Sequence, residues 1–376
     1  MSIGIARSSS AVRVPLAQAL DLGPELWDDL RARSEAESPF MTWAWHRAWA
    51  EAAASSGVGE GQAVVLRSPS GDVEALFPFR IQRTRFRRAP VAALGWALGD
   101  LGCPDHLELL ASPDADLDAL VSELERVPWD IIRLRNVADH APHVEQLGVA
   151  CARRNWSVQR RALWRCPYLE LPGSWDAYLS SLSANRRQII RRKERALRRD
   201  REVVLTEYGR TRFEEGWRHL LDLHARRWVG GGVFREPGME QLHRCFASSL
   251  ADQGRLWLAT LDLNGQPAVA WYGFSSGDTV YYYQGGWDPR WEHHSVGMIL
   301  MGIMIRRAIE RGYRLFDFLR GEEDYKTGWT RTARTCYEVV ITRTGWRGAV
   351  LRGLDWIARQ RAARWPSATV ASAQHT

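Results

Sequence analysis

The segment from Thr279 to Leu319 constrains the fold of this chain more than any other part of its 376 residues. Residues 279–284 are apolar and aromatic, which predicts a strand, and the apolar stretch 296–311 is long enough for a buried helix. A second strand is expected at 315–319, and a glycine and a cluster of ionisable side chains follow it directly. The order of strand, polar loop, helix and strand predicts an α/β unit with an active-site edge after the second strand.

The ends of the helix at 296–311 are well marked in the sequence. Ser295 is a plausible N-cap, and Gly312 follows three arginines as a plausible C′ residue. Gly297 lies in the first turn, where unpaired backbone N–H groups and the helix dipole suit a pyrophosphate. Alternatively, Gly297 and Gly302 only allow the helix to pack closely on a sheet. The neighbouring strand with Asp317 favours binding.

Composition excludes several classes of protein. The chain is 45% apolar and 25% charged, as expected for a globular protein of two domains. It has no apolar run of about 18 residues, and its N-terminus lacks the apolar core of a signal peptide. We expect a cytoplasmic location and leave open a peripheral position at the inner face of the membrane. The five cysteines form no Cys-x-x-Cys pair, so neither a disulfide framework nor a metal site is expected.

The two halves of the chain predict similar series of elements. In the first half we expect a helix at 25–52, strands at 62–66, 73–83 and 91–96, a helix at 117–126, a strand at 130–134 and a helix ending near 154. In the second half we expect helices at 213–228 and 239–253, strands at 255–263, 267–275 and 279–284, the helix at 296–311, a strand at 315–319, a short helix at 324–329 and a strand at 335–342. The repeated order predicts a tandem duplication.

A basic segment separates the halves. Residues 185–201 carry nine basic and two acidic side chains, and together with the stretch from Ser174 they predict one long helix that bridges the domains. This helix is either a solvated basic face or a surface that contacts the phosphates of a donor or acceptor. No nucleic-acid-binding motif accompanies it.

The C-terminal segment 346–365 predicts an amphipathic helix with a basic face. We expect it to pack on the second domain, with a membrane-surface role as the alternative. Residues 366–376 are expected to be disordered.

Several short motifs between residues 175 and 345 carry a resemblance. They are Arg186-Arg187, Arg191-Arg192, Leu223-His224, Arg227-Trp228, Gly254-Arg255-Leu256, Tyr283-Gln284-Gly285, Ser295-Val296-Gly297, Phe316 to Glu322, Tyr325-Lys326 and Trp329. Through them the chain resembles the CelD/BcsL-type acetyltransferase family, a branch of the GNAT superfamily whose tandem GNAT-like folds are related to the FemAB peptidyltransferases. The resemblance implies an α/β fold of two tandem GNAT-like (acyl-CoA N-acyltransferase) domains, with mixed sheets flanked by helices.

The resemblance also divides the chain. We expect a degenerate GNAT-like domain at 1–165, the bridging basic helix at 166–202, a GNAT domain with the donor site at 203–345, and the amphipathic helix with its tail at 346–376. The superfamily's usual phosphate loop, Gln/Arg-x-x-Gly-x-Gly/Ala, is reduced here to His294-Ser295-Val296-Gly297. At the matching place in the first half, residues 113–116 include two aspartates and no glycine. We therefore expect one donor site per chain.

Acyl transfer from a thioester to an amine needs a base, a polarised carbonyl and an acid for the departing sulfur. We expect the base to be Asp317 or Glu322, the acid to be Tyr325, and Lys326 to bind an anion. The alternatives are a structural ion pair for Asp317 and simple solvation for Glu322 and its neighbour. His224 is either a base on the substrate side or a packing residue.

The remaining candidates bind the two substrates. We expect the donor to be held by the backbone of Tyr283, Gln284 and Gly285 and by His294, Ser295, Val296 and Gly297. The expected acceptor-side residues are Arg187, Arg191, Trp228 and Trp329.

These expectations describe an acyl-CoA-dependent N-acyltransferase, with acetyl-CoA as the expected co-substrate and no metal. The acceptor is an amine of a small molecule or of an envelope, peptide or polysaccharide precursor, which attacks directly in a ternary complex in the cleft between the domains. Two alternatives stay open. One is a FemAB-like transferase that uses aminoacyl-tRNA and presents the basic run to the tRNA. The other is a non-catalytic partner in polysaccharide assembly.

Overall fold

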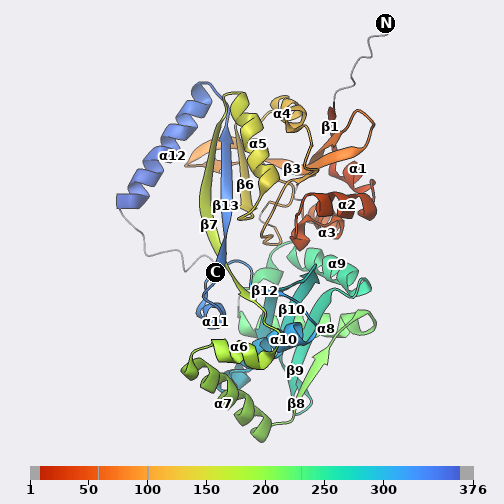
Figure 1. Cartoon of the computed structure of the whole chain (residues 1–376), viewed down its shortest axis with the longest axis vertical. Helices are drawn as coiled ribbons and strands as arrows, with labels where there is room; N and C mark the ends of the chain where they lie inside the picture. The colour runs from red at the N-terminus through yellow and green to blue at the C-terminus, as the bar shows by residue number, and fades with distance from the viewer. Residues whose placement is uncertain (1–8, 58, 100, 230, 365–376) are drawn as a thin grey trace. The chain divides into compact units, whose positions relative to one another are not determined.

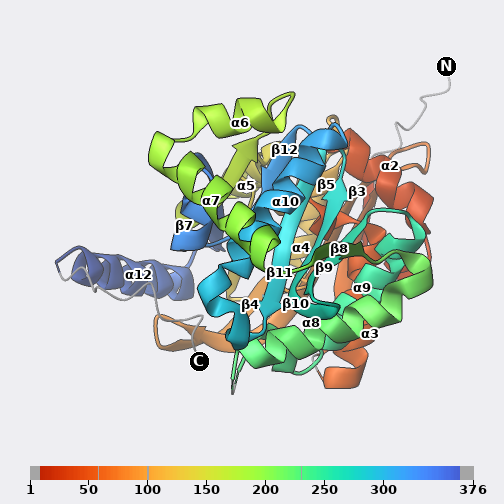
Figure 2. The same cartoon turned by 90° about the horizontal axis from the view of Figure 1, so that it is seen from below.

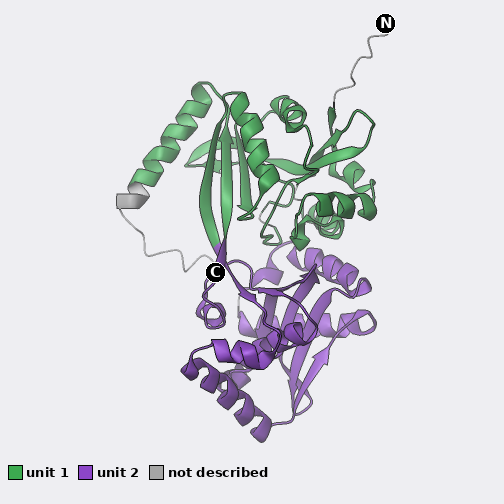
Figure 3. Cartoon of the chain, viewed as in Figure 1, with its two compact units in different colours: residues 1–164, 335–375 green, residues 165–334, 376 purple. Residues whose placement is uncertain are grey.

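The computed structural model describes residues 9–57, 59–99, 101–229 and 231–364, and it divides the chain into two compact units (Figure 1; Figure 3). Unit 1 contains the residues up to Trp164 and those from Thr335 onward, and unit 2 contains residues 165–334. The expected disordered tail, 366–376, lies outside the described residues.

Unit 1 is built on one mixed sheet with helices packed against it. Its strand order is β1-β2-β3-β4-β6-β13-β7, and β5 pairs with β3. The pairs β1–β2, β2–β3, β3–β4 and β6–β13 are antiparallel, whereas β4 and β6 are parallel where Ala93 pairs with Ile131. Its elements are β1 (Ser10–Pro15), α1 (Leu16–Leu20), α2 (Pro24–Arg33), η1 (Pro39–Met41), α3 (Trp43–Ser56), β2 (Gln62–Arg67), β3 (Val73–Phe86), β4 (Ala89–Trp96), β5 (Leu110–Ala111), α4 (Leu117–Glu125), β6 (Ile131–Val137), α5 (Pro142–Arg153), the first part of β7 (Ser157–Glu170), most of β13 (Ala333–Thr342) and α12 (Trp346–Arg364).

Unit 2 repeats this plan around the strand order β7-β12-β11-β10-β9-β8. Its pairs are antiparallel except β11 and β12, which run parallel. Its elements are α6 (Trp175–Ser181), α7 (Ala184–Asp200), β8 (Val203–Glu207), η2 (Arg210–Arg212), α8 (Phe213–Arg227), η3 (Val233–Arg235), α9 (Met239–Asp252), β9 (Leu256–Leu263), β10 (Gln266–Ser276), β11 (Thr279–Trp287), η4 (Pro289–His294), α10 (Val296–Glu310), β12 (Leu315–Asp317) and α11 (Asp324–Thr327).

The strands of unit 2 alternate between two buried faces. Trp257 and Trp271 point toward a core shared with α7 and α10, whereas their neighbour Tyr272 packs against Trp217 of α8 and hydrogen-bonds to His243 of α9. Helices α6, α7 and α10 therefore cover one face and α8 and α9 the other (Figure 2). Because both faces are covered, residues 280–283 of β11 are all apolar or aromatic and show no alternation with polar residues.

Two expected helices are broken in the structure. The helix expected at 25–52 is divided into α2 and α3 because Pro39 opens a separate turn and the Thr42 hydroxyl accepts the Trp45 N–H to cap α3. The single bridging helix expected from Ser174 onward is likewise wrong. Leu182 has extended backbone angles, and the Ser183 hydroxyl accepts the Arg186 N–H to start α7. Both α6 and α7 belong to unit 2.

The C-terminal elements lie in unit 1 rather than in the second domain. Strand β13 pairs with β6, with Val340 opposite Arg133. Helix α12 buries Leu351 against Phe86, Ile131 and Val340 of the same unit. The expectation that this helix packs on the second domain was therefore wrong, and so was the assignment of residues 335–345 to that domain.

Candidate functional site

Strand β11 extends beyond the end of its parallel neighbour, β12. It pairs with β12 only from Thr279 to Tyr281, where Tyr281 lies opposite Asp317, and then continues to Trp287. In the described residues no strand pairs with this later part of β11 on the β12 side, whereas β10 follows it on the other. An edge that no strand covers can add an extended ligand as a further strand.

A β-bulge lies in the same part of β11. Tyr282 is opposite Gly273 and Gln284 is opposite Tyr272, so Tyr283 is the extra residue. Only glycine fits at position 273, because a Cβ there would lie 2.1 Å from the Tyr281 carbonyl oxygen. The Gln284 side chain accepts the Gly285 N–H at 2.9 Å. The bulge thus turns the backbone just where β12 has ended.

Helix α10 begins beyond this edge, after β11 and η4. Ser295 occupies the N-cap position with φ of 55°, but its hydroxyl makes no capping hydrogen bond. A Cβ at Gly297 would meet only the Trp287 ring, at 3.8 Å, whereas a Cβ at Gly302 would lie 3.1 Å from the Trp329 ring. The two glycines therefore differ in role. Close packing against Trp329 restricts position 302, whereas position 297 has room for a larger group.

Basic side chains surround the loop before α10. Lys193 of α7 donates to the His293 carbonyl at 3.5 Å, and the Arg201 guanidinium lies 5.8 Å from the centre of the Trp291 ring. The His294 ring packs beside Trp291. With the uncapped N–H groups of α10, these positive charges favour an anion at this end of the helix.

A buried polar cluster lies next to the open edge of β11. The Arg227 guanidinium is held between the rings of Trp287, at 3.8 Å, and Trp228, at 4.5 Å, and it hydrogen-bonds to the Tyr282 hydroxyl. Tyr282 in turn is hydrogen-bonded to Tyr325, and the Glu323 carboxylate interacts electrostatically with both tyrosines and with Arg227.

The burial of this cluster sets its protonation. Desolvation raises the pKa of Tyr282 and raises that of Tyr325 well above its usual value, and the negative charge of Glu323 adds to both shifts. Tyr325 as a whole residue is 41% exposed, whereas its hydroxyl is buried in the cluster. Both phenols therefore keep their protons at neutral pH. Burial also lowers the pKa of Arg227, which nevertheless stays charged.

The expected catalytic residues have different surroundings. Asp317 is 1% exposed at the end of β12, and its carboxylate accepts the Leu319 N–H at 2.7 Å, which fixes the turn. Glu322 is exposed and pairs with Arg165 at 2.9 Å, away from the cluster. Lys326 is buried and pairs with Glu323 at 3.0 Å. Only Tyr325 and Lys326 among these four meet in the cluster.

His224 lies in an apolar environment on α8. Its ring packs 4.8 Å from Phe234, and burial lowers its pKa to about 4, with Arg227 and Arg235 adding to the shift. Its backbone lies against β11, since a Cβ at Gly286 would come within 2.3 Å of the His224 nitrogen. This geometry is that of a packing histidine.

The expected acceptor-side residues do not form one group. Arg187 donates to the Leu179 and Ser180 carbonyls, and the exposed Arg191 pairs with Asp176 at 3.6 Å. Trp329 is 2% exposed and lies in the core, where Tyr178 donates to its carbonyl. Of the four, Trp228 alone contacts the polar cluster, through Arg227.

Sequence reasoning did not single out Arg227, Tyr282 or Glu323 as site residues. A signal existed for Glu323, which stands three residues before Lys326 and so shares one face of the short helix α11. For Tyr282, strand alternation indicated only that it faces away from its two tyrosine neighbours, and the bulge decides what it meets.

The matching helix of unit 1 lacks these features. Helix α4 follows the parallel strand β4 as α10 follows β11, but the Asp116 carboxylate caps it by accepting the Ala119 N–H at 3.2 Å. A carboxylate at this position repels phosphate, so a single donor site, in unit 2, stays a prediction.

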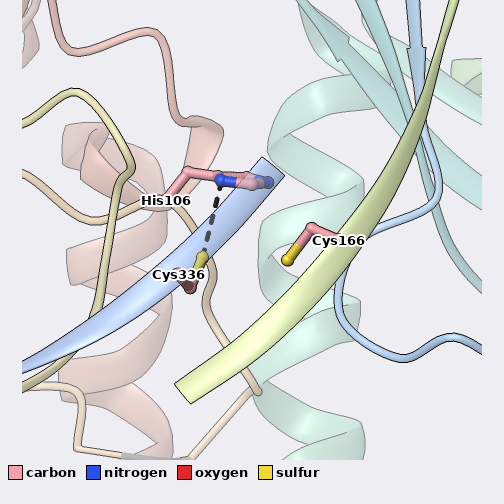
Figure 4. Close-up of side chains that lie close together, drawn as sticks. All are labelled: His106, Cys166 and Cys336. Carbon is pink, nitrogen blue, oxygen red and sulfur yellow. Dashed lines mark hydrogen bonds between the residues drawn. The ribbon is translucent and has the colours of Figure 1, made fainter. Parts of the chain in front are cut away.

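Unit 1 contains a buried thiol and imidazole in contact. The Cys336 sulfur lies 3.6 Å from His106 Nδ1, although 230 residues separate them (Figure 4). Cys166, which is also labelled there, belongs to unit 2. A Cys–His contact therefore forms that sequence spacing did not indicate.

Most of unit 2 matches a known protein family. A family model described as an acetyltransferase (GNAT) domain matches residues 184–327. Residues 184–327 are accordingly a GNAT-type domain, and the chain is an N-acyltransferase. This model covers the open edge of β11, α10 and the polar cluster. No curated protein matches the chain in sequence.

Solved structures resemble the chain in fold at low sequence identity. L-PGS from Bacillus licheniformis is 10% identical over 90% of this chain and 96% of its own, with a TM-score of 0.52. FemX is 10% identical over 78% of this chain and 90% of its own, with a TM-score of 0.51. A conserved protein of unknown function from Bacteroides thetaiotaomicron is 13% identical over 86% and 98%, with a TM-score of 0.55. The expected fold class, with two tandem GNAT-like domains, is confirmed. No helix in the described part of the chain is long and apolar enough to span a bilayer.

Proposed function

We propose that the chain transfers an acyl group, with acetyl as the first choice, from acyl-CoA to an amine, and that unit 2 holds the donor. The observation that carries this proposal is the edge of β11 from Tyr282 to Trp287, which β12 leaves open and which leads to the uncapped start of α10. An extended thioester arm fits along a strand edge, and a pyrophosphate fits at a helix N-terminus.

The residues around this edge suit the two ends of such a donor. At one end, the first-turn N–H groups of α10 and the positive charges of Lys193 and Arg201 favour phosphates, and Gly297 leaves room for them. At the other end, this proposal places the thioester carbonyl beside the backbone of the bulge at Tyr283. The acyl group would then be next to Tyr282 and Tyr325.

The polar cluster supplies the proton transfers in this proposal. Glu323 accepts a proton from the attacking amine, whose nitrogen forms the new bond to the carbonyl carbon. Tyr325 donates its proton to the sulfur as the carbon–sulfur bond breaks, and Tyr282 and Arg227 hold its hydroxyl in place. The raised pKa of Tyr325 keeps this proton available at neutral pH.

The Tyr325→Phe variant tests the acid. Loss of one proton donor lowers kcat by roughly 10²-fold or more with little change in KM. Release of free thiol from acetyl-CoA, measured with a panel of primary amines, gives both constants. Tyr313→Phe is the control, since the Tyr313 ring packs on Trp257 outside the cluster. Equal kcat for Tyr325→Phe and wild type would rule out this role.

The acceptor is proposed from the resemblance to the CelD/BcsL-type family. We infer an amine of a small molecule or of an envelope or polysaccharide precursor, met in the cytoplasm where acyl-CoA is made. A panel of amino sugars, short peptides and polyamines in the same thiol assay separates these classes. Turnover with none of them would remove the acceptor part of the proposal.

A second candidate is a transferase that uses aminoacyl-tRNA. The basic face of α7 favours it, because its arginines are solvent-exposed on one side of the helix: Arg191, Arg192, Arg195, Arg198 and Arg199. Such a stripe suits a phosphate backbone, with binding that weakens steeply as salt increases. Transfer from charged tRNA, with no thiol release from acyl-CoA, would favour this candidate over the first.

A further inference from the structure

Helix α12 presents apolar side chains to solvent. Four of the large apolar side chains that are exposed in the described part of the chain lie on it, at Trp346 (75%), Val350 (50%), Trp356 (58%) and Ile357 (42%). Most tryptophans of the described part are buried or half-buried, and these two are the exceptions. Exposed tryptophans concentrated on one helix indicate a surface that binds something.

These side chains form one stripe along the helix. Trp346 and Val350 are four positions apart and Val350 and Ile357 are seven apart, which places the three on a single face, and Trp356 lies beside Ile357. We define the α12 stripe as the exposed residues Trp346, Ala349, Val350, Gly353, Trp356, Ile357 and Gln360. The stripe is about 20 Å long at the rise of an α-helix.

The opposite face holds the helix in place. Leu351 is buried against Phe86 and Val340. Asp355 is 1% exposed, and its carboxylate pairs with Arg87 at 3.0 Å and with Arg161 at 2.5 Å. Because packing and ion pairs fix this face, the stripe cannot turn inward without breaking buried charge pairs.

The charges beside the stripe select the partner. In the sequence of α12 there are five arginines and one acidic residue, Asp355, which is buried. Arg347 and Arg359 are 68% and 49% exposed beside the stripe, although Arg347 also pairs with Asp130 and Arg359 with Asp355. An antiparallel second copy of the helix would bring arginine against arginine. A partner surface with an anionic outer layer over an apolar layer fits both the exposed apolar side chains and the arginines beside them.

We propose that α12 binds the chain to an anionic phospholipid surface, with the α12 stripe inserted at the level of the headgroups. Tryptophan favours this interfacial level, and flanking arginines add attraction to anionic lipids. The helix lies along the surface rather than across it. This proposal concerns unit 1 and is independent of the donor site.

Co-sedimentation of the full-length chain with vesicles tests the proposal. Vesicles of phosphatidylcholine alone are compared with vesicles of phosphatidylcholine and phosphatidylglycerol, at low and at physiological salt. The W346S/W356S/I357S variant removes the large groups of the stripe without touching the buried face. The V149Q variant is the matched control, because Val149 is 55% exposed on α5 of the same unit.

The wild type and V149Q are expected to sediment with the anionic vesicles and to be released by salt. The triple variant is expected to bind them about 10-fold more weakly or not at all, with an unchanged thermal melt. Absence of wild-type binding, equal binding to neutral vesicles, or full binding by the triple variant would overturn the proposal. A wild-type dimer that the triple variant converts to a monomer, without vesicle binding, would replace the lipid by a second copy.

Discussion

At the scale of single residues, two adjacent glutamates provide the sharpest contrast in the site. Glu323 lies in the cluster with Lys326, Tyr325 and Arg227, whereas Glu322 forms an exposed ion pair with Arg165. The Glu323→Gln variant is expected to lower kcat by roughly 10²-fold or more, because it removes the proposed base. The Glu322→Gln variant is expected to stay within about 2-fold of wild type, since exposed pairs contribute little.

Steady-state rates of both variants with acetyl-CoA and one amine decide between these glutamates. Loss of activity in Glu322→Gln with normal activity in Glu323→Gln would contradict the assignment of the base.

The sequence alone could not separate these residues. Both follow Gly321 in a short polar loop, and the backbone decides which one turns inward. Leu319 and Gly321 have φ values of 57° and 101°, and the Asp317 carboxylate fixes the turn by accepting the Leu319 N–H. Tyr325 and Lys326 were predicted as site residues, and the structure brings them together. Their partners Tyr282 and Arg227 come from other elements, so no local pattern indicates them.

At the scale of elements, glycine on β11 permits close contact with α8. A Cβ at Gly286 would lie 2.3 Å from the His224 backbone nitrogen, so the Gly286→Ala variant must separate helix and strand. We expect it to lower the free energy of unfolding by about 3 kcal/mol. The Gly297→Ala variant, whose Cβ would make only an ordinary contact with the Trp287 ring, is expected to change it by less than about 1 kcal/mol in either direction.

Urea unfolding of both variants measures these changes. A Gly286→Ala protein as stable as wild type would show that the contact between α8 and β11 is looser than described.

The elements of unit 2 were predicted where their patterns are local. Strand β11, helix α10 and strand β12 begin at or within one residue of the expected positions, because turn residues and a helix cap mark them. Strands β7 and β8 were not predicted. β7 is rich in arginine and only partly buried, and β8 has five residues, so neither shows a clear alternation of apolar and polar side chains.

At the scale of the whole molecule, three buried histidines make stability depend on pH. Burial lowers the pKa of His46 and His224 to about 4 and that of His243 to about 3. The unfolded chain binds these protons near pH 6.5, so the stability they contribute is complete above that pH and is lost as the pH falls toward 4. Each contributes on the order of 1–3 kcal/mol.

One buried carboxyl group acts in the opposite sense. Burial raises the pKa of Glu108 to about 7, so its contribution is complete below pH 4.5 and is lost as the pH rises through 7. Burial also lowers the pKa of His143, so four histidines act against one carboxyl, and we expect a net loss of stability between pH 6.5 and 4.5. Urea midpoints across this range measure the loss, and His224→Gln should reduce it. A midpoint that does not fall on acidification would contradict the burial of these histidines.

The boundaries of the two units are the whole-molecule feature that the sequence did not indicate. Two α/β units were expected from the repeated order of elements, and two are present. The chain nevertheless passes from unit 1 to unit 2 within β7 and returns just before Thr335. Strand β13 looks like a continuation of the second unit in sequence, and only its pairing with β6 shows where it belongs.

Calorimetric titration of the intact chain with acetyl-CoA tests the central claim, that one donor site lies between the edge of β11 and the start of α10. The Gly297→Ala and Gly297→Glu variants accompany the wild type, because the first leaves the helix start neutral and the second places a carboxylate there. The account predicts one equivalent bound by wild type and by Gly297→Ala, with binding lost in Gly297→Glu. No binding to wild type, two equivalents, or equal binding by Gly297→Glu would contradict it.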